Sequence, residues 1–268
     1  MTVSERTRAG RRPSAGLSAR PLGRDVVVLC YHAVSDQWPS ALAVTTKALE
    51  AQLRVLVRRG YRGATFADAV LDPPYSKTIA VTFDDAFLSA FELGFPVLSE
   101  LGLPGTVFVP TSFPDRDEPM VWPGIDEWRD GPYASELRPM SWNQLATLAT
   151  AGWEVGSHTR THPRLTTLAA DDLAEELRDS RIRCADVLGR PCRTIAYPYG
   201  DVDQRVVASA ADAGYEAGAA LPIRFDSNDP LCWPRVGVYR ADSLLRYRVK
   251  VSRVARRVRA SGLWTAVR

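Results

Sequence analysis

The strongest constraint on the fold is a regular alternation of short apolar runs with segments of helical periodicity. The apolar runs, which suit strands buried on both faces, are 26–31, 78–83, 105–109, 153–156 and 194–197. The helical segments between and after these runs are 45–59, 87–101, 143–150, 171–188 and 202–213. Because crossover helices join parallel strands, the pattern predicts an α/β fold, either an open parallel sheet or a barrel.

Polar residues that can carry chemistry gather where the predicted strands end. His32 follows the first run, Asp84 follows the second and His158 follows the fourth. In (β/α) barrels the carboxyl ends of the strands carry the active site. We therefore favour a (β/α) barrel over an open sheet.

The two ends of the chain differ from this α/β core. Residues 1–24 contain several arginines but no apolar core of a signal peptide, and we interpret them as a disordered basic leader. Residues 240–268 carry nine Lys and Arg against one Asp, with Leu and Val at helical spacing. This pattern predicts a basic amphipathic C-terminal helix over 241–268, which could pack on the barrel or lie on an anionic membrane surface.

Composition narrows the class of protein. A net charge of +3 is too small to indicate nucleic-acid binding, and the C-terminal segment has only Tyr247 and Trp264 as stacking rings. No stretch reaches the ~18 apolar residues of a membrane span. The four cysteines form no C-x-x-C pair, which favours reduced thiols. We expect a cytoplasmic protein without a nucleic-acid partner, peripheral at the inner membrane face if the tail binds lipid.

Two short motifs predict a metal centre. HTRTH at 158–162 holds two of the three histidines of the chain, four positions apart, so both can reach one ion. TFDDAF at 82–87 ends an apolar run with two carboxylates, which need a cation or proton partner if they are buried. One Asp with two His leaves open positions for water and substrate, as a catalytic zinc site requires. The alternatives are two unrelated loop histidines and a carboxylate pair that caps the next helix.

Three other segments are candidates for the same site. In AYPYG at 196–200, a fixed turn could aim the backbone N–H of Tyr199 at a developing oxyanion, or could simply end a strand. In LCYHAV, His32 follows the first strand, where a lone histidine is often a core or capping residue. The segment 111–139, rich in Pro, Asp and Trp, has little periodicity and predicts a loop on the substrate side.

Taken together, TFDDA (82–86), HTRTH (158–162) and AYPYG (196–200) resemble the ordered motifs of polysaccharide deacetylases of the NodB-homology, carbohydrate-esterase-4-like type. The resemblance covers residues 25–240. It implies a distorted (β/α) barrel and metal-dependent hydrolysis of N-acetyl groups on an amino-sugar-containing glycan or a lipid-linked sugar. An O-acetyl esterase, an N-deformylase of sugars and a non-catalytic glycan-binding module remain alternatives on the same scaffold.

The resemblance also implies roles for single residues. Asp85, His158 and His162 would bind a divalent metal, with Zn²⁺ as the default and Co²⁺, Ni²⁺ or Mn²⁺ fitting the same ligands. Asp84 would be the general base, and Tyr199 would supply the backbone oxyanion donor. The residues that we predict to contact the carbohydrate substrate are Tyr197, Pro198 and Trp233.

Three departures from the family pattern affect these roles. Ala86 replaces the usual Gly, so we expect an ordinary backbone conformation there. Ala196 replaces the arginine that orients the base in relatives, and Arg235 in WPRVGV is the candidate substitute, with a plain surface or ion-paired arginine as the alternative. No histidine follows position 162, whereas Tyr31 and His32 resemble the Y-H motif of poly-N-acetylglucosamine deacetylases, which assigns the catalytic acid to His32.

Overall fold

The computed structural model describes residues 24–221 and 229–260. The predicted leader, apart from Arg24, and the last eight residues of the predicted tail helix lie outside the described residues. The described strands are β1 (Asp25–Tyr31), β2 (Ala33–Val34), β3 (Ala43–Val44), β4 (Arg62–Ala64), β5 (Lys77–Phe83), β6 (Gly105–Val109), β7 (Glu154–Ser157), β8 (Thr194–Ala196), β9 (Ala217–Ala220), β10 (Trp233–Pro234) and β11 (Val236–Gly237). The described α-helices are α1 (Thr46–Arg58), α2 (Phe66–Leu71), α3 (Phe95–Glu100), α4 (Trp142–Thr150), α5 (Ala170–Leu188), α6 (Gln204–Asp212), α7 (Leu244–Lys250) and α8 (Arg253–Ala260).

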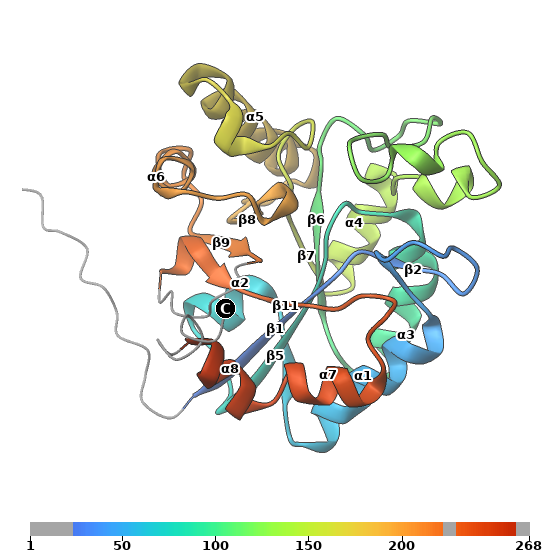
Figure 1. The fold of residues 1–268 in the computed structure, drawn as a ribbon. Coiled ribbons are helices and arrows are strands. Elements are labelled where there is room, and N and C mark those ends of the chain that lie inside the picture. Colours follow the sequence, from blue (N-terminus) through green and yellow to red (C-terminus); the bar gives the residue numbers. More distant parts are fainter. Residues whose placement is uncertain (1–23, 222–228, 261–268) are drawn as a thin grey trace, which may run out of the picture.

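A parallel sheet curls into a nearly closed barrel, with most of the helices on its outer side (Figure 1). Its strand order is β10-β9-β8-β7-β6-β5-β1-β11. At one end of this order β10 pairs with β9, and at the other end β11 pairs with β1. Only Arg235 separates β10 from β11, so the extended stretch Trp233–Gly237 joins both ends of the sheet. This arrangement confirms the predicted distorted (β/α) barrel.

One source of the distortion lies along β5. On the edge of β5 opposite β1, residues Thr78–Ala80 pair with the short β4 and residues Val81–Phe83 pair with β6. The helix α2 follows β4 directly and packs into the barrel end where the strands begin, because Phe66 and Val70 belong to the same apolar cluster as the barrel interior.

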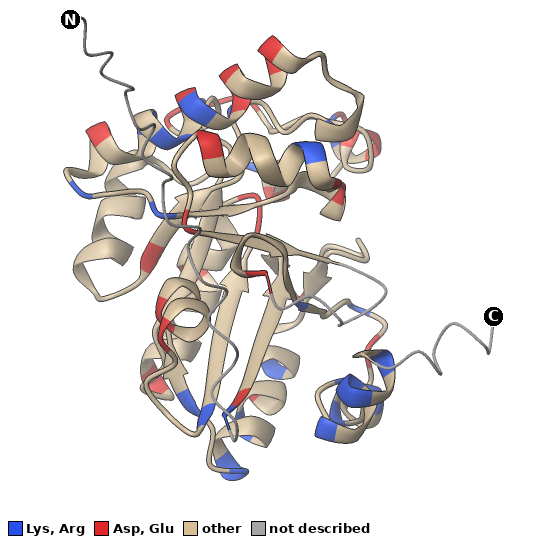
Figure 2. Ribbon diagram, turned by 90° about the vertical axis from the view of Figure 1, so that its left-hand side faces the viewer, with Lys and Arg blue, Asp and Glu red and all other residues tan. Residues whose placement is uncertain are grey.

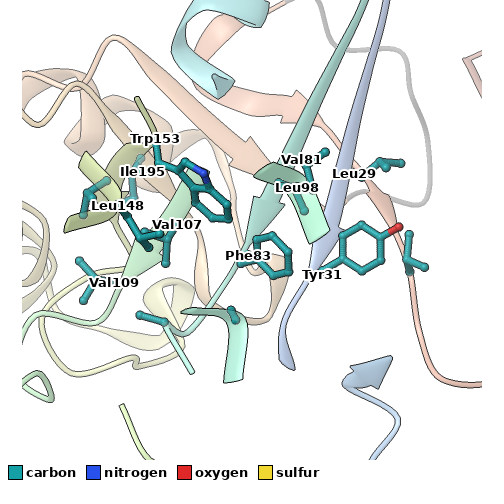
Figure 3. Packing of buried hydrophobic residues seen from close by; sticks show 14 of the residues in the cluster. Leu29, Tyr31, Val81, Phe83, Leu98, Val107, Val109, Leu148, Trp153 and Ile195 are labelled. Carbon is teal, nitrogen blue, oxygen red and sulfur yellow. The ribbon is translucent and has the colours of Figure 1, made fainter. Parts of the chain in front are cut away.

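Side-chain alternation divides the core into an outer and an inner layer. Along β5, Ile79, Val81 and Phe83 belong to the larger cluster between the strands and the surrounding helices. Within that cluster the rings of Phe83 and Trp153 stack with centroids 5.8 Å apart (Figure 3). Burial of each such side chain contributes about 1.5–3 kcal/mol to folding. The helices are therefore held to the sheet mainly by this outer layer.

The inner layer is built from small residues. Alanines of β5, β8 and β9 share the barrel interior with Phe108 and Trp233, which fill the remaining space. Gly156 of β7 is part of the same packing, because a Cβ atom there would lie 2.6 Å from both the Phe108 ring and Thr194 Oγ1. Since the middle of the barrel is filled, a ligand site must lie at one of its ends.

The structure corrects two predicted helices. The predicted helix 87–101 is a π-helical turn, Ala90–Gly94, continued by α3. The predicted C-terminal helix divides into α7 and α8 within the described residues. The N–H of Val251 bonds to Tyr247 at the end of α7, and the Ser252 hydroxyl accepts the Ala255 N–H at the start of α8. None of the described helices has the length and apolar character needed to cross a bilayer.

Candidate active site at the carboxyl ends of the strands

Strand register brings the candidate residues to one end of the barrel. β1 and β5 are parallel with Tyr31 opposite Phe83, so His32 and Asp84 leave the barrel side by side. The Asp84 N–H also donates to the Tyr31 carbonyl at 2.9 Å. β7 ends directly before His158, whose N–H donates to the last residue of β6 at 2.8 Å. The parallel sheet therefore assembles motifs that lie far apart in sequence.

The three predicted metal ligands converge. Asp85 Oδ1 lies 3.3 Å from Nε2 of His158 and 3.2 Å from Nε2 of His162. The ligand atoms of all three residues lie within 4.8 Å of one another, and all three residues are buried. Asp85 Oδ1 is buried and has no hydrogen-bond donor among the described residues. Buried lone pairs that face each other without a donor between them fit a shared cation.

Neighbouring groups fix the orientation of His158 and shift the pKa values of His158 and His162. Nδ1 of His158 lies 2.8 Å from the Ala196 carbonyl, so it carries the proton and leaves the Nε2 lone pair toward Asp85. Burial lowers the pKa of His162, and this outweighs the opposing effect of Asp85. For His158 burial also lowers the pKa, but Asp85 outweighs it and raises the pKa above the ordinary value.

The loop that carries both histidines is held by α5. The buried carboxylate of Glu176 accepts the N–H groups of Arg160 and Thr161 at 2.8 and 2.9 Å. It also accepts the Thr161 hydroxyl at 2.6 Å. A charged acceptor with several donors is a strong anchor. No sequence motif indicates Glu176, because it lies in the middle of a helix with many other acids.

Asp84 is held by a buried arginine. Nη1 and Nη2 of Arg235 donate to the two carboxylate oxygens at 2.6 and 2.7 Å, and Nη1 also donates to Thr82 Oγ1 at 2.9 Å. Asp84 is 2% exposed and Arg235 is 1% exposed. Burial raises the pKa of Asp84, but Arg235 outweighs burial and lowers the pKa to about 2. Arg235 is therefore a buried, ion-paired arginine and not a surface one, and its partner is the candidate base.

Backbone strain is concentrated in this region. The left-handed residues other than glycine include Asp85 (φ 69°), Thr159 (φ 67°), His162 (φ 66°) and Tyr199 (φ 60°). Such conformations cost free energy and persist where the surrounding structure enforces them, often at functional sites. Ala86 is also left-handed, with φ 54°. The expectation of an ordinary backbone at Ala86 is therefore wrong, and the residue keeps the conformation that glycine adopts without strain.

His32 faces the pocket rather than the core. It is partly exposed, and its Nδ1 has no hydrogen-bond partner among the described residues. One of its ring nitrogens lies within 4.8 Å of an Asp84 oxygen and of the Cys30 thiol. The thiol also donates to Asp84 Oδ2 at 3.4 Å. Cys30 is therefore a further neighbour of Asp84, although it belongs to none of the three sequence motifs.

A pocket of about 560 Å³ opens above these residues. The predicted loop 111–139 forms one wall of it, with Trp122 and Trp128, and Tyr239 contributes another aromatic ring. The Trp122 ring stacks on His162 with centroids 4.2 Å apart, so it also supports a candidate metal ligand. Two tryptophans in a Pro- and Asp-rich loop indicated a binding surface, but the sequence alone did not show that both line this pocket.

Tyr199 lines the pocket, whereas the three predicted substrate contacts do not. Tyr197 is fully buried and donates its hydroxyl to the Leu231 carbonyl at 2.7 Å, and Pro198 is buried beside it. Trp233 fills the barrel interior and reaches a different cavity, beside the start of β1. The structure therefore corrects all three substrate-binding predictions. Neighbouring residues in a strand point to opposite sides, so proximity to a motif does not place a side chain in the pocket.

The fold and site define a (β/α)-barrel protein with a group of residues at its carboxyl end that could hold a metal ion. A sequence profile of the family described as polysaccharide deacetylase matches residues 72–218, more than half of the chain. The chain belongs to this family.

Relatives and solved structures agree with this assignment. The chain is 25% identical over 207 residues to YxkH of Bacillus subtilis, a polysaccharide deacetylase by name, with 75% of this chain and 66% of YxkH covered. It is 37% identical over 93 residues to chitin deacetylase 1 of Cryptococcus neoformans, covering 32% of this chain and 20% of that protein. The structure resembles BA0330 of Bacillus anthracis, with a TM-score of 0.70, 23% identity and 85% and 69% of the two chains covered. It also resembles IcaB of Ammonifex degensii, with a TM-score of 0.69 and 24% identity, and the match covers 85% of this chain and 97% of IcaB. The two structural likenesses show the fold, and the chain spans less than two thirds of the length of both sequence relatives.

Proposed function

We propose that the protein is a metal-dependent hydrolase that removes N-acetyl groups from an amino-sugar-containing carbohydrate. The observation that carries the proposal is the convergence of Asp85, His158 and His162 beside a carboxylate that Arg235 holds ionised. Membership of the polysaccharide deacetylase family supports the reaction class. The pocket supports a carbohydrate, because tryptophan rings on its wall can cover the apolar face of a sugar while carboxylates and imidazoles meet its polar groups.

The donor set fits a divalent metal ion. Two imidazoles and one carboxylate are a common catalytic set for Zn²⁺, and Co²⁺, Ni²⁺ or Mn²⁺ accept the same ligands. When bound, such an ion supplies a Lewis acid that polarises an acyl carbonyl and lowers the pKa of water. The buried Asp85 Oδ1 without a donor and the fixed tautomer of His158 are the features of this chain that fit the ion.

The residues of the chain divide the proton transfers between them. Asp84 accepts a proton from the water that attacks the acyl carbon, and Arg235 keeps the carboxylate aligned for this step. The backbone N–H of Tyr199 donates to the carbonyl oxygen as negative charge develops on it. The carbon–nitrogen bond then breaks, and His32 gives a proton to the leaving amine. The products are acetic acid, which ionises to acetate by giving a proton to solvent, and the free amino sugar. Asp84 then gives its proton to solvent and His32 takes one up, so the site returns to its starting state.

The test is an assay of acetate and formate release from N-acetylated, N-formylated and O-acetylated sugars, with metal analysis of the same preparation. We expect acetate from N-acetylated substrates and one divalent ion per chain. His158→Ala should lose both the ion and the activity, because one of three ligands is removed. Asp212→Ala, which removes an exposed carboxylate on α6, is the matched control and should keep both.

Other outcomes of this assay separate the alternatives. Release of formate alone, or of acetate from esters alone, would move the acyl specificity to a deformylase or an esterase with the same site. A metal-loaded chain that binds glycans but releases nothing would identify a binding module. A fully active His158→Ala variant would contradict the proposed metal site itself.

A further inference from the structure

The two C-terminal helices present apolar side chains to solvent instead of to the barrel. In the described part of the chain, eight large apolar side chains are more than a third exposed. Five of them lie on α7 and α8, namely Leu244, Leu245, Val249, Val254 and Val258. Leu245 and Val254 are each 73% exposed. Scattered exposed residues are normal, but a concentration on two adjacent helices indicates a surface with a binding partner.

The apolar residues are on the outer faces of the helices because other residues attach the inner faces. On α7, Tyr247 is fully buried, and Leu245 and Val249 lie two positions before and after it. At 100° per residue, both therefore point away from the barrel. On α8, Arg256 reaches inward to Asp25 at 2.6 Å, and Val254 again lies two positions away. A helix that only covers a barrel would show the opposite pattern.

Basic residues flank this apolar surface. Residues 244–260 contain seven Lys and Arg and no Asp or Glu. Figure 2 shows this as helices marked almost only in blue near the described end of the chain. Asp242 engages Arg246 and Lys250, whereas Arg248 and Arg257 make no ion pair with any residue that the structure describes. The surface therefore combines exposed aliphatic side chains with positive charge that is not neutralised.

We propose that the outer face of α7 and α8 binds an anionic lipid bilayer. A helix with arginines beside Leu and Val can lie in the interfacial plane, with its aliphatic side chains among acyl chains and its arginines at lipid phosphates. Each basic residue near such a surface adds attraction that is screened by salt. A second copy of the chain fits poorly, because a symmetric contact would bring arginines against arginines. Lipid binding by this face would not depend on the proposed hydrolase activity.

A small basic cavity lies on the inner side of α8. It has a volume of about 210 Å³ and lies between α8 and the first residues of β1. Its lining includes Arg24, Arg253, Arg256 and Arg257, with Asp25 as the one acidic residue. Arginine is well suited to phosphate, because its guanidinium can donate two parallel hydrogen bonds. The cavity therefore offers a place for a phosphate group on the barrel side of α8.

The location of α8 determines how the active site would face. Arg256 contacts Asp25 at the start of β1, whereas His32 follows the end of that strand. A strand of this length spans about 20 Å. In Figure 1, α7 and α8 lie at the bottom, and the loop 111–139, which walls the pocket, lies at the upper right. A bilayer against α7 and α8 would leave the pocket open to the aqueous side. Together with the proposed function, on which this step rests, the orientation favours a glycan that extends into solution over a sugar head group of the same bilayer.

Flotation of the full chain with vesicles tests the proposal. We expect binding to phosphatidylcholine–phosphatidylglycerol vesicles, weak binding to pure phosphatidylcholine, and release by salt. Leu245→Ser with Val254→Ser, and separately Arg248→Glu with Arg257→Glu, should each weaken binding by at least about tenfold. The matched control is Ile182→Ser with Arg178→Glu on α5, which changes an exposed apolar residue and an exposed arginine elsewhere and should bind as the unmodified chain does.

Circular dichroism and thermal unfolding show whether the variants remain folded, and both should be unchanged. Amide hydrogen exchange with and without vesicles tests the orientation, with slower exchange expected in 244–260 and no change in 122–128. The proposal is overturned if the chain ignores anionic vesicles, or if the control weakens binding as much as the tail variants. Protection of 122–128 by vesicles would overturn the orientation, and self-association without lipid that needs Leu245 would identify a second copy as the partner.

Discussion

Replacement of Arg235 by Met is the most informative single perturbation of the site. The change removes both hydrogen bonds to Asp84 but keeps an unbranched side chain in the barrel interior. Asp84 would then be a carboxylate that is 2% exposed and has no cation beside it in the described chain. Loss of one partner of a buried ion pair typically costs about 3–5 kcal/mol.

Protonation of Asp84 sets an upper limit to this cost. In the variant, the buried carboxyl can become neutral instead of remaining charged. The ordinary pKa of an Asp carboxyl is near 4, which is three units below pH 7. Protonation of Asp84 at pH 7 therefore costs about 1.36 kcal/mol for each of these three units, or about 4 kcal/mol. Because the folded-state pKa of the variant is raised, the penalty grows as the pH rises above about 4 and falls as the pH drops. We expect a loss of about 3–4 kcal/mol at pH 7 and at most about 1.4 kcal/mol at pH 5.

Urea unfolding at the two pH values measures this effect, with metal-free and metal-loaded samples compared. Asp84→Asn with Arg235→Met is the control, because it removes both charges and should recover more than half of the lost stability. A cost below about 1 kcal/mol for Arg235→Met, or a cost independent of pH, would refute the view that this ion pair is buried and essential to Asp84.

The same ion pair affects any test of Asp84 as the general base. Asp84→Asn alone leaves Arg235 buried without its counterion, so a loss of activity could come from a disturbed site. In the background of Arg235→Met, Asp84→Asn removes the base without leaving a buried charge. The expected result is a stable protein that keeps its metal content and loses turnover by about 10²-fold or more.

Three further outcomes are expected. Asp25→Asn should cost about 1–3 kcal/mol, because Asp25 accepts two short hydrogen bonds and binds α8. Burial raises the pKa of Asp25, but Tyr61 and Arg256 outweigh burial and lower the pKa below its ordinary value. The stability that Asp25 contributes is therefore present above about pH 4 and is lost as the pH falls further. Acid titration of the unmodified chain and of Asp25→Asn would show this difference. Gly156→Ala should lower stability by about 1–3 kcal/mol in thermal unfolding, because its Cβ would lie 2.6 Å from the Phe108 ring, whereas Gly131→Ala, with open space around it, should change little. Trp122→Ala should weaken metal affinity about tenfold in a binding titration, because it removes the ring that stacks on a ligand.

The grouping of the candidate metal ligands was predictable because strand ends obey a simple rule. In a parallel barrel all carboxyl ends meet at one face, so residues that follow different strands must lie close together. Asp85 and His158 follow β5 and β7, and the structure places them as this rule requires. Arg235 could be chosen only by comparison with the family, because β10 and β11 have two residues each and give no periodic signal.

The failed predictions share a physical cause, which is side-chain direction. Ala196 belongs to the inner layer of the barrel, so Tyr197 must point to the outer layer, although both belong to the same motif. Ala86 shows the same limit for the backbone. Its identity indicated ordinary dihedral angles, but the turn between β5 and the following helix requires a left-handed residue, and the site enforces it.

The C-terminal helices show why periodicity alone could not decide between a packing helix and a membrane helix. A stripe of Leu and Val at helical spacing is the same in both cases, and only its direction differs. The direction is set by a few contacts with distant residues. Asp25 at the start of β1 draws Arg256 inward, and a buried Tyr247 attaches α7. Because Arg256 and Tyr247 occupy the inner faces, Leu245 and Val254 lie on the outer faces of their helices. Asp25→Asn should therefore loosen α8 without removing its apolar residues, which separates the attachment of the helix from the binding of lipid.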